Sequence, residues 1–406
     1  MVEKRKISKE IFSWLLFDFA NSSYAVIIIA FLFPVYFSST IAKGNPFRDL
    51  YYSVSVSISM LFVAVLNPIL GASSDFYSNK KKFLIFFTIL CVVATSLLFF
   101  SKEGMIIYAM SIFVLANIGF NSSLVFYDSF LPKICEKENL HKISSYGYAF
   151  GYIGSLISVA ITLFFIEVPE NSFLATGIFF LFFSLPIFFI LKEEKKEIVE
   201  KINVFQVGIQ RILQTLKELK LHKKVALFLI SYFFYIDVIN TIIFFSGIFA
   251  KETLKFSMED LAYFFIIVQF MAFVGAILFS KLATIFGEKK ILLFNLFSWM
   301  ILIAAIYFVE NKNLFFVIGS FAGIFLGSTQ SLSRSFYAKL LPQNKFGEFF
   351  GFYSMFEKTT SIIGPFVFGI VSSFTGNQKY AIVSLFPFLI FGIIILTQIN
   401  VLKNEN

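Results

Sequence analysis

The stretch IFSWLLFDFANSSYAVIIIAFLFPVYF (residues 11–37) is almost wholly apolar and long enough to cross a bilayer as a helix. It carries Asp18 and Asn21 three residues apart, which places both side chains on one helical face. A charged side chain inside a spanning helix costs at least about 2.5 kcal/mol on insertion scales, so it usually faces protein or a watery cavity. We therefore expect this face to line the interior of a helix bundle.

A second apolar stretch, residues 225–249, repeats the pattern with Asp237 and Asn240 at the same spacing. Transporters built from internal repeats place their binding region near the midplane, where the repeats meet. The two pairs are therefore predicted to form opposite walls of one central site. The alternative is that each pair is a structural polar contact between helices, and the duplication favours the central site.

The composition is that of an integral membrane protein. Of the 406 residues, 58% are hydrophobic and only 15% charged, and the mean hydropathy is +0.82. The lysines behind the net charge of +9 lie in loops between apolar stretches, which indicates anchoring at a lipid bilayer rather than nucleic-acid binding. Two cysteines and two loop histidines give no support for a disulfide framework, a metal site or a cofactor.

Hydropathy along the chain gives twelve apolar spans and predicts an all-α membrane protein with two pseudo-symmetric bundles of six transmembrane helices. A single long charged interruption divides them, so the domains are predicted as 1–191, a linker at 192–224, and 225–406. Phe205, Ile209 and Ile212 recur at helical spacing and predict an interfacial amphipathic helix in the linker. The spans are 11–37, 51–73, 83–100, 105–127, 143–166, 172–191, 225–249, 259–282, 291–309, 314–338, 347–373 and 378–402.

Several short matches between the halves support a duplication. Pro132 and Pro342 are 210 residues apart, as are Gly154 and Gly364. The run KKFL at 81–84 matches KKIL at 289–292 with an offset of 208. Near-equal offsets indicate six-plus-six repeats.

The loop between the second and third spans reads GASSDFYSNKKK (71–82) and resembles the signature loop of the major facilitator superfamily. Gly71, Asp75 and Lys80 fit the pattern, whereas Phe76 replaces the usual basic residue. Longer stretches resemble the vacuole-effluxer-like branch, relatives of the autophagy-related amino-acid effluxer of vacuoles. They are WLLFDFANSSY (14–24), NSSLVFYDSFLP (121–132), SSYGYAFGYIGS (144–155) and SLSRSFYAKLLPQNKFGEFFGFYSMFEKTTSIIGP (331–365).

The resemblance implies alternating-access transport, with amino-acid efflux as the best-known activity. It also implies that the first, fourth, seventh and tenth spans line the central path. This adds Asn117 and Asn121 of the fourth span and Gln330 of the tenth to the substrate and ion-coupling candidates. Arg334 and Asp128 stand near span ends, which favours a gating or interface role.

Gly71, Asp75 and Lys80 are interpreted as a gate latch, because glycine permits close helix approach and a carboxylate can cap a neighbouring helix N-terminus. The alternative is a capped loop without a gating role, which the residues alone favour, so the latch is what the resemblance implies.

Lys358 lies about 16 Å into the eleventh span and needs a partner there. Glu357 projects about 100° away on the helix, so Asp18, Asp237 or a substrate carboxylate is the expected partner. In this hypothesis Lys358 neutralises an acid when the site is empty and turns to the carboxylate of a zwitterion when it is full. An Asp then takes the amine or a proton, which couples transport to protons. A permanent ion pair is the structural alternative.

The resulting prediction is a monomeric secondary transporter for a small solute such as an amino acid, and not an enzyme. No nucleotide-binding loop of the G-x-x-x-x-G-K-[ST] type occurs, and no catalytic motif survives inspection. The main rival is a membrane receptor or scaffold that keeps the transporter fold without moving solute. If the source is bacterial, the protein is expected in the plasma (inner) membrane.

The loop charges predict which ends of the helices face the cytoplasm. Alternate loops and termini hold 26 lysines and arginines on one side and 7 on the other, with Lys358 outside both sets. Both termini and the linker 192–224 should therefore be cytoplasmic. With Cys91 and Cys135 replaced, Lys195→Cys should resist an impermeant thiol reagent added to intact cells, whereas Lys43→Cys should react. Labelling of Lys195→Cys from outside would show the opposite orientation, with the linker outside the cell.

Overall fold

The computed structural model describes most of the chain: residues 8–77, 79–135, 140–193, 221–341 and 360–399, with 209, 210, 213, 217, 219, 352, 353, 356 and 357. These residues form helices and their connections, and no strand occurs among them, so the predicted all-α fold is confirmed. Eleven helical stretches are long and apolar enough to cross a membrane, and Ile363–Thr375 is a shorter apolar helix. Most of the linker 192–224 lies outside the described residues, so the domain boundary and its amphipathic helix stay predictions.

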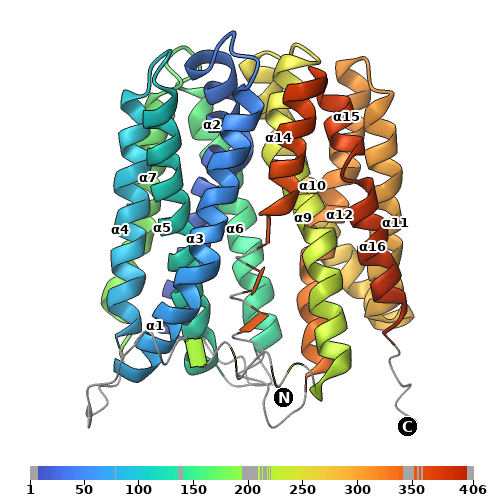
Figure 1. Cartoon of the computed structure of the whole chain (residues 1–406). Coiled ribbons are helices and arrows are strands. Elements are labelled where there is room, and N and C mark those ends of the chain that lie inside the picture. Colours follow the sequence, from blue (N-terminus) through green and yellow to red (C-terminus); the bar gives the residue numbers. More distant parts are fainter. Residues whose placement is uncertain are drawn as a thin grey trace.

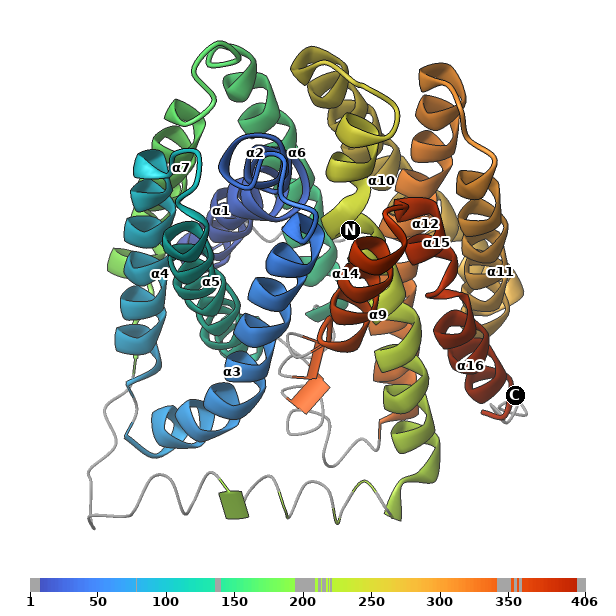
Figure 2. The ribbon, with the colours of Figure 1, turned by 45° about the horizontal axis from the view of Figure 1, so that its top comes forward.

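The helices run roughly along one common direction (Figure 1). Helices α1 to α7 gather on one side and α9 to α16 on the other in both views (Figures 1 and 2). The first group consists of α1 (Lys9–Tyr24), η1 (Ala25–Phe31), α2 (Leu32–Tyr36), η2 (Phe37–Ile41), α3 (Arg48–Tyr77), α4 (Lys80–Leu97), η3 (Leu98–Phe100), α5 (Ile106–Ile134), α6 (Leu140–Leu163) and α7 (Asn171–Ile190). The second consists of α9 (Lys223–Glu252), α10 (Met258–Phe286), α11 (Glu288–Tyr307), α12 (Lys312–Leu340), α14 (Ile363–Thr375), α15 (Gln378–Val383) and α16 (Phe386–Thr397).

Successive long helices run in opposite directions between the two ends of the bundle (Figure 1). The end at which α1 begins and α16 finishes is called the terminus end, and the other is called the opposite end (Figure 1). The charge count predicts that the terminus end is cytoplasmic.

The first span contains two wider helical turns, η1 and η2, on either side of α2. Pro34 in α2 has no main-chain N–H, so the carbonyl four residues earlier loses its usual helical donor. Such π-helical turns occur where the regular ladder is disturbed and are frequent at functional sites. The span still forms one continuous crossing from Lys9 to Ile41.

The eleventh span differs from the prediction of one helix across 347–373. Residues 360–362 are not helical, and α14 begins only at Ile363. Ser361 has a φ of 78°, in the left-handed region. Pro365, in the first turn of α14, cannot donate a hydrogen bond to the preceding turn, which favours a helix start at this point. We call residues 360–362 the helix break.

The repeated lysine runs make equivalent contacts in the two groups. Lys81 Nζ donates to the carbonyl of Leu191 at 2.7 Å, and Lys289 Nζ donates to that of Ile399 at 2.8 Å. Both donors and both acceptors are 208 residues apart, the offset between KKFL and KKIL. Each ammonium compensates the partial negative charge and unpaired carbonyls at the end of a helix. The contacts join α4 to α7 and α11 to the end of α16.

Loss of either lysine cap should destabilise the protein by about 0.3–1 kcal/mol, the usual contribution of a cation at a helix C-terminus. We expect Lys81→Met and Lys289→Met to lower the free energy of unfolding of the purified protein in detergent by similar amounts. Lys82→Met and Lys290→Met are matched controls, because both side chains are exposed and stand one residue further along. Equal losses in the controls would mean that the caps are not the source of stability.

Candidate functional site

Asp18 lies where α1 packs against α6. A Cβ atom on Gly147 of α6 would overlap Asp18 Oδ2, and one on Gly154 would overlap the Phe19 carbonyl, so glycine is what lets the two helices approach. Asn21 Nδ2 donates to the Phe17 carbonyl at 2.8 Å and to Asp18 Oδ1 at 3.3 Å. Asp18 is only half-buried. Its carboxylate is therefore held in place by its own helix and by α6.

Tyr127 of α5 packs against a further part of α1. Its ring stacks on Trp14 with centroids 4.4 Å apart and on Phe17 at 4.9 Å, and Trp14 Nε1 donates to the Tyr127 carbonyl at 3.1 Å. The next residue, Asp128, is in electrostatic range of Asp18. Packing of α1 on α5 thus brings two acids together that are 110 residues apart in the chain.

Arg334 of α12 brings a positive charge from the second group of helices to these acids. Its side chain is buried, and its Nη2 lies 3.8 Å from Glu357 Oε2. Its guanidinium carbon lies 5.0 Å from the ring centroid of Tyr148 on α6, a cation–π distance. Asp18 and Asp128 are both in electrostatic range of Arg334. We call Asp18, Asp128, Tyr148, Arg334 and Glu357 the central charged cluster.

Asp237 and Asn240 have different partners from Asp18 and Asn21. The N–H of Gly364, at the start of α14, donates to Asp237 Oδ2 at 2.7 Å. Asn240 Nδ2 donates to Ser361 Oγ at 2.9 Å and lies 3.5 Å from Thr360 Oγ1. The second pair therefore holds the helix break, while the first faces the central charged cluster.

The other predicted path residues lie on α5 and α12. Asn117 Nδ2 donates to Ser59 Oγ of α3 at 2.6 Å, and Asn121 Nδ2 donates to Asn117 Oδ1 at 3.0 Å. Both asparagines are buried, and the chain of contacts ties α5 to α3. Gln330 is half-buried on α12, one turn before Arg334.

The predicted latch is only partly described. Gly71 and Asp75 lie in the last turns of α3, with side chains outside the described set. Lys80 begins α4, and its main-chain N–H donates to Glu193 Oε1 at 2.7 Å. The acid that caps α4 is thus Glu193 at the end of α7. Lys358 lies outside the described residues.

Contacts between the two groups also gather at the opposite end, and the sequence did not single them out. Arg48 Nη2 lies 3.0 Å from Glu252 Oε2, joining α3 to α9. Asp49 Oδ2 accepts hydrogen bonds from Ser372 Oγ at 2.5 Å and from Gln378 Nε2 at 2.8 Å. The positions of these charged residues at predicted span ends could have suggested contacts between helices. A single sequence does not show which span ends lie next to each other.

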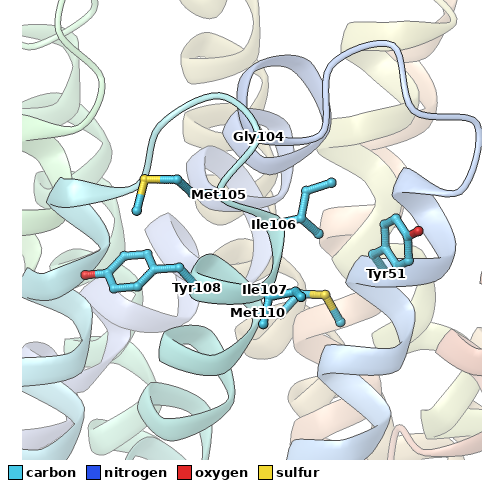
Figure 3. Close-up of a pocket in the computed structure, with 7 residues that line it drawn as sticks. All are labelled: Tyr51, Gly104, Met105, Ile106, Ile107, Tyr108 and Met110. Atoms are coloured by element: carbon cyan, nitrogen blue, oxygen red, sulfur yellow. The ribbon is translucent and has the colours of Figure 1, made fainter.

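An apolar surface pocket of about 560 Å³ lies between the start of α3 and the start of α5 (Figure 3). It is lined by Tyr51, Gly104, Met105, Ile106, Ile107, Tyr108 and Met110, and Ile107 is 80% exposed. It shares no residue with the central charged cluster. A lining without charged groups does not suit a charged solute, so the pocket is not our candidate site.

The family model described as "Vacuole effluxer Atg22 like" matches residues 47–406. The chain belongs to this family. Among its relatives, the "Uncharacterized MFS-type transporter YxiO" of Bacillus subtilis is 31% identical, covering 97% of this chain and 95% of the relative. "Autophagy-related protein 22" of Kluyveromyces lactis is 25% identical over 87% and 79% of the two chains.

Solved structures of two other transporters share the fold of this Atg22-like protein. A bacterial homologue of the iron transporter ferroportin in an outward-facing state has a TM-score of 0.63 at 12% identity, covering 97% of this chain and 99% of the other. A bacterial homologue of the lysosomal transporter Spinster in an inward-facing state has a TM-score of 0.64 at 10% identity, covering 96% and 95%. The protein is thus a multi-pass membrane transporter of the major facilitator type, and its relatives are transporters rather than enzymes.

The Arg334–Glu357 contact allows a test of the cluster. Removing one partner of a buried ion pair leaves an uncompensated charge and costs about 3–5 kcal/mol. Arg334→Gln should therefore strongly lower the free energy of unfolding in detergent, and Arg334→Gln with Glu357→Gln should cost less than the two single changes summed.

The Lys312–Asp260 pair is the matched control, because it starts on the same helix, α12, and is more exposed. Its coupling free energy should be at most about 1 kcal/mol in the same double-mutant cycle. Equal coupling in the two pairs would contradict a buried charge contact at Arg334.

Proposed function

We propose that this Atg22-like transporter moves a small zwitterion, such as an amino acid, by proton-coupled alternating access. The observation that carries the proposal is the central charged cluster, in which acids of α1 and α5 lie within electrostatic range of an arginine of α12. A zwitterion presents one positive and one negative group, so a site with both signs of charge is complementary to it. Charged residues within transmembrane segments commonly mark substrate and proton paths.

Arg334 is the described residue best suited to the substrate carboxylate. A guanidinium offers a planar fork of donors that fits a carboxylate, and the ring of Tyr148 supports its other face. A bound carboxylate would replace Glu357, whose Oε2 lies 3.8 Å from Arg334 Nη2. Lys358, outside the described residues, is a second cation for this role.

Asp18 is the described residue best suited to the substrate amine. It is half-buried, so solute can reach it with less rearrangement than the buried Asp237 would need. Exchange of partners within the cluster avoids leaving one charge alone in the membrane, which would cost about 3–5 kcal/mol.

The contacts between the two groups of helices support alternating access. Arg48, Glu252 and Asp49 join the groups at the opposite end, whereas Arg334 and Tyr148 meet nearer the terminus end. Alternating access requires that such contacts break on one side at a time, so in this proposal the central charged cluster is both the solute site and the contact nearer the terminus end. Efflux is the proposed direction, because the matching family model describes a vacuole effluxer.

The test is uptake of a panel of amino acids into proteoliposomes, with and without a pH gradient. Asp18→Asn should reduce gradient-driven transport by about ten- to a hundredfold, because a hydrogen bond to a charged group contributes about 1.5–3 kcal/mol. Asp260→Asn, at the opposite end and away from the cluster, should leave transport unchanged. Wild-type rates in Asp18→Asn would contradict the assigned role, and a wild-type protein that moves no solute would favour a receptor or scaffold.

A further inference from the structure

The helix break receives polar contacts from both groups of helices. On α9, Asp237 Oδ2 accepts the N–H of Gly364, and Asn240 Nδ2 donates to Ser361 Oγ. From α3, in the other group, Ser57 Oγ donates to the carbonyl of Ile362 at 2.9 Å. The break therefore joins a carboxylate of the seventh span to a contact between the two groups.

Ser361 needs these contacts to keep its conformation. Its φ of 78° lies in the region that non-glycine residues rarely adopt and that costs free energy relative to a helical conformation. The break also leaves the first N–H groups of α14 without helical acceptors, at the positive end of the helix. An ionised Asp237 compensates both, because it accepts the Gly364 N–H and places negative charge at this helix N-terminus.

The surroundings of Asp237 make its contact with Gly364 depend on whether the carboxylate carries a proton. The residue is 1% exposed, and its Oδ1 is a buried oxygen without a hydrogen-bond partner in the described part of the chain. A buried carboxylate with one unpaired oxygen is costly as an anion, whereas the start of α14 stabilises that anion. Because burial disfavours the anion and the start of α14 favours it, adding one proton changes the strength of the contact.

The elements packed against α9 bring no other described charge onto Asp237. Helices α2, α14, α16 and segment η1 have no charged side chain. On α12 the charged residues are engaged elsewhere, Arg334 with Glu357, Lys312 with Asp260 and Lys339 with Glu288. On α10 the charged residues are Glu259, Asp260 and Lys281, at its ends. Among described groups, the N–H groups of Gly364 and Ser361 face the carboxylate.

The contact made by Ser57 continues toward the opposite end. One turn earlier on α3, Ser53 lies against Gly369 of α14, where a Cβ would overlap its hydroxyl. One turn earlier again, Asp49 accepts the hydrogen bond of Ser372. Ser57, Ser53 and Asp49 thus form one stripe along α14, and the helix break is its inner end.

We propose that Asp237 is the binding site of the coupling proton and that its charge holds the helix break in place. This inference rests on the proposed proton-coupled transport. It makes Asp237 the residue through which proton binding changes the conformation. Hydronium from the aqueous phase gives a proton to Oδ1, which leaves water and a neutral carboxylic acid that holds the Gly364 N–H more weakly. Ser361 then relaxes toward the helical region, the Ile362 carbonyl leaves Ser57, and the α3–α14 contact opens at the opposite end.

The experiment measures access to the α3–α14 contact without any substrate. With Cys91 and Cys135 replaced, Ser53→Cys reports opening, because Ser53 is fully buried against α14. Its labelling by a maleimide in proteoliposomes should be faster in mildly acidic than in mildly alkaline buffer. Adding Asp237→Asn, which mimics the protonated acid, should make labelling about tenfold faster in alkaline buffer and remove the pH dependence.

A second substitution separates the charge effect from simple damage. Glycine adopts a positive φ without strain, so Ser361→Gly should keep the break formed without help from Asp237. Combined with Asp237→Asn, it should return labelling in alkaline buffer toward the wild-type rate. Alone, it controls for loss of the serine hydroxyl and should reduce the acid-driven increase.

The outcomes distinguish this proposal from the proposed function. Unchanged pH dependence in Asp237→Asn, or no rescue by Ser361→Gly, would overturn the assignment even if amino acids are transported. A pH response that needs Asp237 would support it even if the substrate panel finds no amino acid. If Asp237→Asn does not insert, an acid response in Ser361→Gly as large as in the wild type overturns the proposal, and a smaller response supports it.

Discussion

A carboxylate or main-chain polar group taken into a membrane must find its partner inside the protein, because the lipid offers none. The contact between Asp237 Oδ2 and the Gly364 N–H meets this demand for the amide and for one oxygen of the carboxylate. The same demand explains Lys81 and Lys289, whose ammonium groups bind the last carbonyls of α7 and of the segment after α16. Each of these contacts pairs polar groups that are exposed where a helix ends or breaks.

The two halves share a pattern but use it differently. Asp18 and Asp237 stand at the same position of an Asp-x-x-Asn motif, and glycines of the fifth and eleventh spans lie against the helices that carry them. In the first half α6 is continuous across Gly151, so Asp18 is left to face Asp128 and Arg334. In the second half Ser361 occupies the corresponding position, 210 residues later, and the helix is broken there. Asp18 is thus half-buried among charged groups of other helices, whereas Asp237 is buried against the main chain at the helix break.

This division of roles fits the demands of a transporter. A binding group must change partners during the cycle, and a half-buried acid within electrostatic range of an arginine fits that requirement. A group that couples proton binding to movement of the two halves must instead bond to a main-chain segment that moves. The two groups of helices meet in two separate sets of contacts. One set is the central charged cluster, and the other lies at the opposite end, at Arg48 and Asp49. Opening of one set while the other holds is what alternating access requires.

The sequence by itself determined the membrane class, the apolar spans and the presence of acids within them. These follow from local composition, since a span needs only enough consecutive apolar residues to cross the lipid. It also indicated the repeat, and the matched lysine runs prove to make matched contacts. The tertiary structure alone decided which polar groups meet. Glu357 was not expected to bind Arg334, and nothing local distinguished Asp18 from Asp237, because their partners lie on other helices whose rotation and breaks depend on packing.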